Sequence, residues 1–142
     1  MLYEQAEQFP LGDCKVLRQS GNDKACIVAA GITVHEALKA HETLKEQGIS
    51  VAVVDLYSIK PLNKKMLLDV VQRAGNNVLT VEDHYLEGGM GEVVTCALAN
   101  TGVNVTNLAV QKLPRSGTPE ALMALMEIDA AGIVKAVCGL FE

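Results

Sequence analysis

The sequence has neither an excess of basic residues nor a long apolar run. It contains 12 Lys and Arg against 17 Asp and Glu, for a formal net charge of −5. A general nucleic-acid binder needs a basic face to engage phosphates, so this balance argues against that class. No apolar run approaches the roughly 20 residues that span a bilayer. The first ten residues lack the basic and apolar regions of a signal peptide. We therefore expect a cytoplasmic protein whose partners include neither nucleic acid nor membrane.

Paired cysteines and nucleophile motifs are missing as well. The four cysteines are far apart in sequence and form no C-x-x-C or Cys/His ligand spacing; they are Cys14, Cys26, Cys96 and Cys138. Disulfide frameworks and zinc sites need such spacings, so we expect reduced, structural thiols. The G-x-S-x-G pattern of a nucleophile elbow and a complete G-x-G-x-x-G phosphate loop do not occur either.

What the sequence does contain is an alternation of apolar strands and amphipathic helices. Its 142 residues correspond to one domain that can bury a core. Residues 1–13 are polar and are interpreted as a surface strap or the remnant of a linker, which leaves residues 14–142 as the domain. Strands are predicted at residues 15–18, 25–30, 51–54, 78–81 and 103–110. Helices between and after them predict an α/β fold, with a sheet covered by helices on both faces.

Polar residues predict where the helices begin. Thr33, followed three residues later by Glu36, predicts a capping box for the first helix. Further predicted caps are Asn63 for the second helix, Thr118 before Pro119 for the fourth and Asp129 for the last.

Residues 80–94 contain the densest cluster of candidate functional groups. Glu82, Asp83 and His84 follow a strand, and together with Glu87 they offer a His and three carboxylates, which suit Mn, Mg or Zn by type. Adjacent residues point in different directions, however, and no second His lies at a helical offset. We favour a role in which a carboxylate accepts backbone N–H groups at a helix start and His84 bridges two elements.

Three glycines in the same stretch, Gly88, Gly89 and Gly91, precede a helix. Their backbone N–H groups could cradle a phosphate. Glu87 and Glu92 flank the turn and would repel an anion. Close packing of the helix against its strand explains the glycines better.

Four stretches resemble the C-terminal domain of the transketolase family, and most closely its animal-type members. They are TVEDHYLEGGMGEVV at residues 80–94, AGITVHEAL at 30–38, DLYSIKPL at 55–62 and LPRSG at 113–117. The β subunits of ketoacid dehydrogenases carry a similar final domain, but residues 60–62 and 80–94 favour transketolase. The resemblance covers essentially the whole chain.

The resemblance implies a three-layer α/β/α sandwich with a five-stranded mixed sheet of order 1-3-2-4-5, in which strand 1 is antiparallel. In that order the chain reverses direction across the sheet between the strands that end at residues 30 and 81. Open α/β sheets place ligands at such a switch point. The candidate switch-point crevice therefore comprises Thr33, His35, Glu82, Asp83, His84, Gly88, Gly89 and Gly91.

The resemblance also implies a function for the whole enzyme. Transketolases transfer a two-carbon ketol unit between sugar phosphates with thiamine diphosphate and a divalent metal, and this chemistry belongs to two other domains of the family. Their Gly-Asp-Gly signature is absent here, because Gly12-Asp13-Cys14 departs from it at the third position. We therefore predict no catalytic, cofactor-binding or metal-binding residue in this chain, and no cofactor.

The implied role is to complete a protomer with the remaining transketolase domains and to support a homodimer. Two alternatives stay open: a module that binds a small regulatory ligand at the switch point, and the small subunit of a split transketolase. We also expect the isolated chain to self-associate, and residues 82–87 and 114–117 are the first candidates for the contact.

Overall fold

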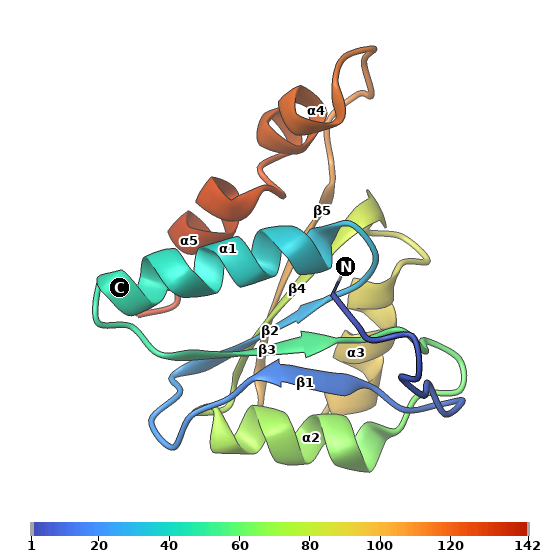
Figure 1. Cartoon of the computed structure of the whole chain (residues 1–142), viewed down its shortest axis with the longest axis vertical. Helices are drawn as coiled ribbons and strands as arrows, with labels where there is room; N and C mark the ends of the chain where they lie inside the picture. The colour runs from blue at the N-terminus through green and yellow to red at the C-terminus, as the bar shows by residue number, and fades with distance from the viewer. Residues whose placement is uncertain (1, 142) are drawn as a thin grey trace.

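The computed structural model describes residues 2–141 and contains five strands and five helices. In chain order they are β1 (Lys15–Arg18), β2 (Ala25–Ala29), α1 (Thr33–Glu46), β3 (Val51–Asp55), α2 (Lys64–Arg73), β4 (Asn77–Tyr85), α3 (Met90–Leu98), β5 (Asn104–Val110), α4 (Pro119–Met126) and α5 (Ala130–Gly139). The sheet order is β1-β3-β2-β4-β5, and only β1 runs antiparallel to its neighbour, which confirms the expected topology (Figure 1). Within residues 2–141 no helix is long and apolar enough to cross a membrane.

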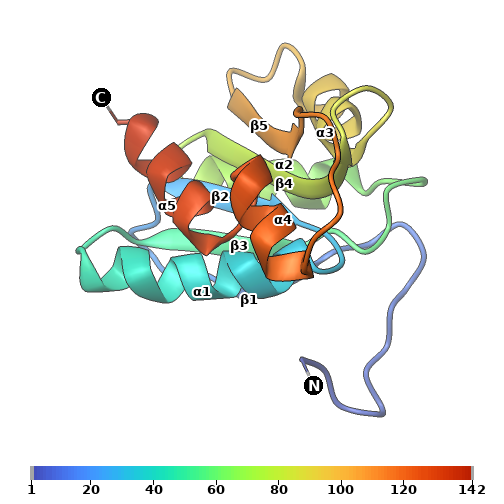
Figure 2. The ribbon, with the colours of Figure 1, turned by 90° about the horizontal axis from the view of Figure 1, so that it is seen from above.

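Alternating side chains of β2 enter two separate cores. Ala25, Ile27 and Ala29 pack on the side of α1 and α5, whereas Cys26 and Val28 pack on the side of α2 and α3. All five are fully buried. Successive residues of a strand point to opposite faces, so a continuous apolar run is accommodated where helices cover both faces. Figure 2 shows these helix layers on the two sides of the sheet.

Three of the four predicted helix caps are confirmed. The side chain of Asn63 accepts the N–H of Met66 at the start of α2. At α4 and α5, the residues Thr118 and Asp129 accept the N–H groups of Ala121 and Gly132.

The capping box predicted for Thr33 and Glu36 is wrong. Helix α1 begins without a side-chain cap. The hydroxyl of Thr33 instead lies 2.8 Å from the carbonyl oxygen of Val81, on β4. The carboxylate of Glu36 accepts the N–H of Ala130 at the start of α5, over 3.0 Å. Both side chains therefore bind backbone groups of other elements and do not form the local capping box.

The expected end of β4 at Val81 is also wrong, because the strand continues to Tyr85. Its parallel pairing with β5 runs to Val81 opposite Leu108 and resumes at Tyr85 opposite Val110. The register shifts between these pairs, so residues 82–84 form an irregularity within the strand rather than a loop. Pairing with β5 extends a strand whose own apolar pattern has already stopped.

Residues 2–13 contain no helix or strand and are held at the carboxyl end of β3 by aromatic contacts. The rings of Tyr3 and Phe9 meet edge to face with centroids 4.9 Å apart, and Phe9 meets Tyr57 in the same way at 5.0 Å. Tyr3 donates its hydroxyl to the carboxylate of Asp55 over 2.5 Å. Burial, and then this hydrogen bond, raise the pKa of Tyr3. Asp55 is 7% exposed, and among the described residues Tyr3 is the side chain that donates to its carboxylate.

Replacing Tyr3 by Phe should loosen the strap at neutral pH. The variant leaves the carboxylate of Asp55 without its donor, so we expect the free energy of unfolding to fall by about 1–3 kcal/mol. The pKa of Tyr3 is raised in the folded chain, so this contribution is present below the ordinary tyrosine pKa of about 10 and is lost as the pH rises above it. Guanidinium unfolding at neutral and alkaline pH measures both effects.

The matched control is Tyr57→Phe, which removes an exposed bond of 3.1 Å to the carbonyl oxygen of Pro10. We expect this second variant to lose less stability at neutral pH. Equal losses in the two variants would contradict a special role for the contact between Tyr3 and Asp55.

Candidate functional site

The chain reverses direction across the sheet between β2 and β4. These strands are parallel neighbours, yet β2 leads through α1 to β3 on one side and β4 leads through α3 to β5 on the other. Their carboxyl ends therefore continue toward opposite faces of the sheet, which is where open α/β sheets form crevices. Every predicted member of the crevice lies near these two strand ends, but their environments differ.

Thr33 joins the two strand ends. Its side chain is fully buried, and its Oγ1 lies 2.8 Å from the carbonyl oxygen of Val81 and 2.9 Å from that of Ala30. The same oxygen accepts the N–H of Ala30. The hydroxyl thus ties the segment after β2 to β4, and it has no remaining face toward solvent.

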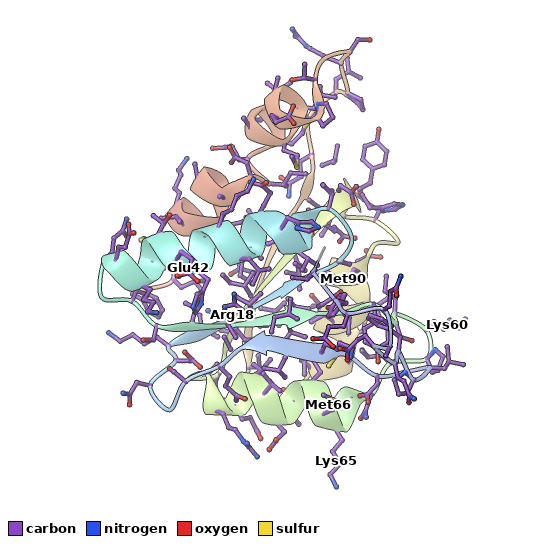
Figure 3. All side chains as sticks on the ribbon, in the orientation of Figure 1. Arg18, Glu42, Lys60, Lys65, Met66 and Met90 are labelled. Atoms are coloured by element: carbon purple, nitrogen blue, oxygen red, sulfur yellow. The ribbon has the colours of Figure 1, made fainter. Side chains whose placement is uncertain are left out.

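Glu82 holds the start of α3. Its residue is 4% exposed, and its carboxylate accepts the N–H of Met90 over 2.6 Å and that of Gly91 over 2.8 Å. Met90 itself lies among the side chains of the core (Figure 3). Charge-assisted bonds at a helix N-terminus are favourable, since they satisfy two N–H groups that the helix leaves unpaired. This confirms the expected use of a carboxylate at a helix start.

The remaining amides of the glycine turn are paired as well. The N–H of Gly88 donates to the carboxylate of Glu92 over 2.7 Å, and the N–H of Gly89 donates to the carbonyl oxygen of Leu86 over 3.2 Å. With those of Met90 and Gly91 bound by Glu82, every backbone N–H of residues 88–91 has an internal partner. A phosphate bound at this turn would need these same N–H groups as its donors.

Close packing accounts for two of the glycines and backbone conformation for the third. A Cβ on Gly89 would lie 2.5 Å from a carboxylate oxygen of Glu82 and from the carbonyl oxygen of Tyr85. A Cβ on Gly91 would lie 2.9 Å from the Asn107 side chain. Gly88 has a φ of +74°, which side chains other than glycine rarely adopt. The packing role predicted for the turn is confirmed at Gly89 and Gly91.

Asp83, His84 and His35 are exposed. His84 was expected to bridge two elements, but its Nδ1 lies 2.8 Å from the carbonyl oxygen of its neighbour Tyr85, so that expectation is wrong. Within residues 2–141 no group of three His, Cys, Asp or Glu side chains converges to hold a metal ion. A shallow crevice of about 200 Å³ is lined by Ala30, Ile59 and Met90 with residues 82–84 and 88–89. Thr33, His35 and Gly91 do not line it.

Two of the four cysteines are inaccessible. Cys14 and Cys26 are buried, and Cys96 is exposed. Burial raises the pKa of the Cys14 thiol to about 11 and raises that of Cys26 as well. Both groups therefore stay as thiols near neutral pH, as expected for structural cysteines.

A larger groove, which the sequence did not reveal, opens between the end of β4 and α4. It has a volume of about 470 Å³ and is mostly apolar, with Ile32, Val110, Leu122, Met123, Met126 and Ile128 in its lining. Residues 83–85 line it from β4, and Pro114 and Arg115 line it from the segment before α4. Both segments proposed for self-association thus contribute to one surface. No local signal predicts the groove, because it depends on where α4 lies.

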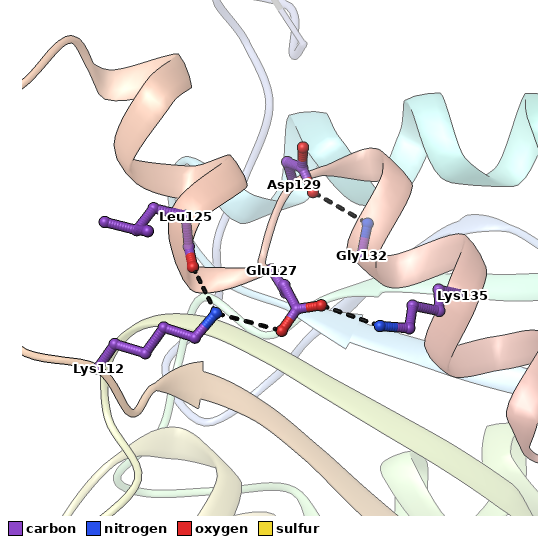
Figure 4. A network of polar contacts seen from close by, with 6 residues as sticks. All are labelled: Lys112, Leu125, Glu127, Asp129, Gly132 and Lys135. Atoms are coloured by element: carbon purple, nitrogen blue, oxygen red, sulfur yellow. Dashed lines mark hydrogen bonds and ion pairs between the residues drawn. The ribbon is translucent and has the colours of Figure 1, made fainter.

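Exposed polar contacts join the end of α4 to its neighbours (Figure 4). Lys112 donates to the carbonyl oxygen of Leu125 over 2.8 Å and lies 3.4 Å from the carboxylate of Glu127. Lys135, on α5, donates to the same carboxylate over 3.0 Å. The hydrogen bonds from Lys135 and then Lys112 lower the pKa of Glu127. The network connects the end of β5, the end of α4 and the side of α5.

The fold and its switch point define an α/β/α domain whose edge strand β1 is antiparallel. The family model for "Transketolase, C-terminal domain" matches residues 12–133, so the chain belongs to that family. Transketolase of Mus musculus is 46% identical over 141 residues, which are 99% of this chain and 23% of the mouse protein. Transketolase of Homo sapiens is 44% identical with the same two shares. The chain thus spans about a quarter of the length of these curated relatives.

Solved transketolase structures share the fold of this chain. A structure described as a split gene transketolase, an inactive beta4 tetramer, matches with a TM-score of 0.89 and 30% identity. The match covers 98% of this chain and 45% of that chain. Transketolase of Campylobacter jejuni matches with a TM-score of 0.70 and 16% identity, over 97% of this chain and 20% of that one, which shows the shared fold alone.

Replacing Glu82 by Gln should destabilise the chain, because the amide is a weaker acceptor for the two N–H groups and brings an unpaired donor into a buried site. We expect a loss of about 1–3 kcal/mol in the free energy of unfolding. Glu92→Gln is the matched control, since its carboxylate accepts a single N–H at an exposed position. Urea unfolding followed by circular dichroism compares them, and an equal loss in both would refute the anchoring role.

Replacing Gly89 by Ala should also destabilise the chain, since the new Cβ would displace the Glu82 carboxylate or the backbone at Tyr85. We expect about 1–3 kcal/mol, from overpacking. Gly21→Ala is the control, because no atom lies within 4 Å of its Cβ position and its φ is not positive. If both variants melted with the parent, the turn would not be a packing feature.

Proposed function

We propose that this chain serves as the C-terminal domain of a transketolase, completing the protomer and supporting its dimerisation without contributing a catalytic group. The observation that carries the proposal is the family match over residues 12–133, in a chain that corresponds to 23% of mouse transketolase. The whole enzyme would transfer a two-carbon ketol unit between sugar phosphates, using thiamine diphosphate, in the cytoplasm.

The switch-point contacts support a structural role for the domain. A group that acts on a substrate needs a free donor, acceptor or lone pair within reach of it. Thr33 and Glu82 instead bind backbone groups of this chain, and the amides of residues 88–91 are paired internally. A regulatory ligand in the crevice is the less supported alternative, since exposed Asp83 and His84 are the polar side chains left to meet it.

The residues of this chain do not fit the cofactor of the whole enzyme. A divalent metal bound through a diphosphate takes additional oxygen ligands from the protein. The Gly-Asp-Gly signature is absent from the sequence, and no three potential ligands converge within residues 2–141. We therefore assign thiamine diphosphate and its metal to the companion domains.

The split gene transketolase structure favours a second candidate. That protein shares 30% identity with this chain, and the match covers 45% of its length. In this version the companion domains belong to a separate polypeptide, and the present chain acts as the small subunit. Its surface would then have to bind those domains without a covalent link.

A domain exchange tests the proposal. We expect mouse transketolase that carries this chain in place of its own C-terminal domain to regain activity over mouse transketolase truncated before that domain. Because the two sequences are 46% identical, we expect this chain to contact the other domains of the mouse enzyme as the native domain does. Turnover is measured with pentose phosphates, thiamine diphosphate and magnesium, after circular dichroism has shown that the chimera is folded.

The isolated chain is the second arm of the same experiment, and we expect no turnover above a blank without protein. A folded chimera that is no more active than the truncated enzyme would refute the role in assembly. Turnover by the isolated chain would refute the absence of catalytic groups.

A further inference from the structure

Another cavity opens at the amino ends of the strands, away from the switch point. We call it the basic pocket; it has a volume of about 260 Å³ and is lined by residues 18–20 and by Asp23, His41, Lys45 and Ser50. Ser50 immediately precedes β3, whereas the switch-point crevice lies at the carboxyl ends of β2 and β4. The two cavities are therefore at opposite ends of the sheet.

Three side chains of the basic pocket are basic and come from two elements. Arg18 is the last residue of β1, and His41 and Lys45 lie about one turn apart on α1. Because β1 runs antiparallel to β3, its carboxyl end lies at the amino end of β3. A chain with a net charge of −5 thus gathers basic groups from separate segments around one cavity.

The helix dipole explains only part of this arrangement. A basic side chain in the last turn of a helix is favourable, which accounts for Lys45 on α1 but not for Arg18 on β1. Carbonyl groups at this end of α1 also have partners, and that of Leu44 accepts the N–H of Ile49 over 2.9 Å. Lys45 is exposed and takes part in none of the ion pairs of residues 2–141. Its ammonium group is therefore available to a ligand.

His41 gains a donor when it is protonated. Its Nδ1 lies 3.0 Å from the carbonyl oxygen of Val51. A carbonyl oxygen only accepts hydrogen bonds, so Nδ1 carries the proton of the neutral ring. The Nε2 atom then holds a lone pair in the neutral ring and becomes an N–H donor in the charged one. The basic pocket thus has two permanent cations and a third that forms as the pH falls.

Two carboxylates lie near these cations. Asp23 is 7% exposed, and its oxygens accept the N–H and the hydroxyl of Ser20 over 2.6 and 2.7 Å. Glu42 does not line the pocket, and its carboxylate lies 3.8 Å from the Nε of Arg18 (Figure 3). Asp23 is held by its own turn, whereas the exposed pair of Glu42 and Arg18 is weak enough for an anion to replace it.

We propose that the basic pocket binds the phosphate group of a small phosphate monoester. Arg18 and Lys45 pair with its oxygens, and protonated His41 donates to it from Nε2. A phosphate group carries nearly two negative charges and three acceptor oxygens, which match three basic groups; a carboxylate brings one charge and two oxygens. The inference does not depend on the proposed role in assembly.

The size of the basic pocket favours an ester over the free ion. A water molecule occupies about 30 Å³ of liquid, so a cavity of about 260 Å³ has room for more than a phosphate group. The amide of Gln19 and the hydroxyl of Ser50 supply neutral hydrogen-bonding groups for the organic part of the ligand.

The first measurement is a titration of the isotope-labelled chain with inorganic sulfate at constant ionic strength, followed by the NMR shifts of its backbone amides. Sulfate keeps two negative charges over the whole pH range used, so any pH dependence comes from the protein. We expect saturable shifts at the residues of the basic pocket. Binding should be roughly tenfold tighter at about pH 5.5 than at about pH 8, since histidines gain their proton in this range.

Charge removal locates the site. Lys45→Gln and Arg18→Gln should each weaken sulfate binding roughly tenfold, because each removes a charge-assisted hydrogen bond. Lys64→Gln is the matched control, since it makes the same change in net charge at an exposed position outside the pocket. Glu42→Gln should tighten binding several-fold, because it frees Arg18 from its acidic neighbour. The amide spectrum of each variant shows whether it is folded.

His41→Asn separates the two nitrogens of the ring. The Asn amide can still donate to the carbonyl oxygen of Val51, but it gains no charge at low pH. We expect this variant to bind sulfate like the parent at about pH 8 and to lose the tightening at about pH 5.5. His35→Asn is the control, because His35 is exposed at the other end of α1, and it should keep the tightening.

The last comparison is between inorganic phosphate and glycerol 3-phosphate at about pH 8, where both carry nearly two negative charges. We expect the ester to bind more tightly, and binding no tighter than that of phosphate would overturn the assignment to a monoester. An anion site in this pocket would be overturned by sulfate shifts that do not saturate or that lie elsewhere in the chain. It would also be overturned if Lys64→Gln weakened binding as much as Lys45→Gln.

Discussion

The central strands of this sheet must be covered on both faces, and the arrangement of the helices depends on that requirement. β2 and β3 are buried along their whole lengths, and their side chains alternate between two cores. A right-handed crossover places its helix on the face set by the direction in which the chain moves along the sheet, so that direction must reverse for both faces to be covered. α1 therefore follows β2 onto one face and α3 follows β4 onto the other, and a switch point arises between them.

Two buried polar residues at the switch point, Thr33 and Glu82, hold these diverging elements together. Thr33 connects the segment after β2 to β4, and the Glu82 carboxylate of β4 binds the first N–H groups of α3. The absence of side chains at Gly89 and Gly91 lets the turn lie against Glu82 and Asn107. An acid beside a glycine-rich turn is a pattern often read as a ligand site. Here its geometry is that of a buried, charge-assisted helix cap.

The groove between the end of β4 and α4 has a different physical origin from the two cores. After β5 the chain leaves the sheet, and residues 111–121 are exposed throughout. Met126 and Ile128 then bury the end of α4 in the core on the side of α1 and α5, and the exposed ion pairs of Glu127 with Lys112 and Lys135 add to this contact. Apolar side chains that would otherwise join a core then line an open groove. This places part of the chain's 49% hydrophobic content at the surface.

The sequence by itself determined the features that depend on neighbours within one turn or along one strand. The apolar runs of β2 and β3 and the caps Asn63, Thr118 and Asp129 are of this kind, because each cap binds an N–H three residues away. The packing role of the glycine turn could also be inferred locally, whereas the strand order came from the family resemblance. Together these observations were sufficient for the fold and the family.

Tertiary structure decided the features whose partners are distant in sequence. Thr33 and Glu36 have the spacing of a capping box, yet their partners lie 48 and 94 residues away. β4 reaches Tyr85 because β5 pairs with it, and the groove exists because Met126 and Ile128 place the end of α4 against the core on the side of α1 and α5. A local pattern specifies what a side chain can bind. Which group it does bind depends on which distant segments the sheet and its crossovers bring within hydrogen-bond distance.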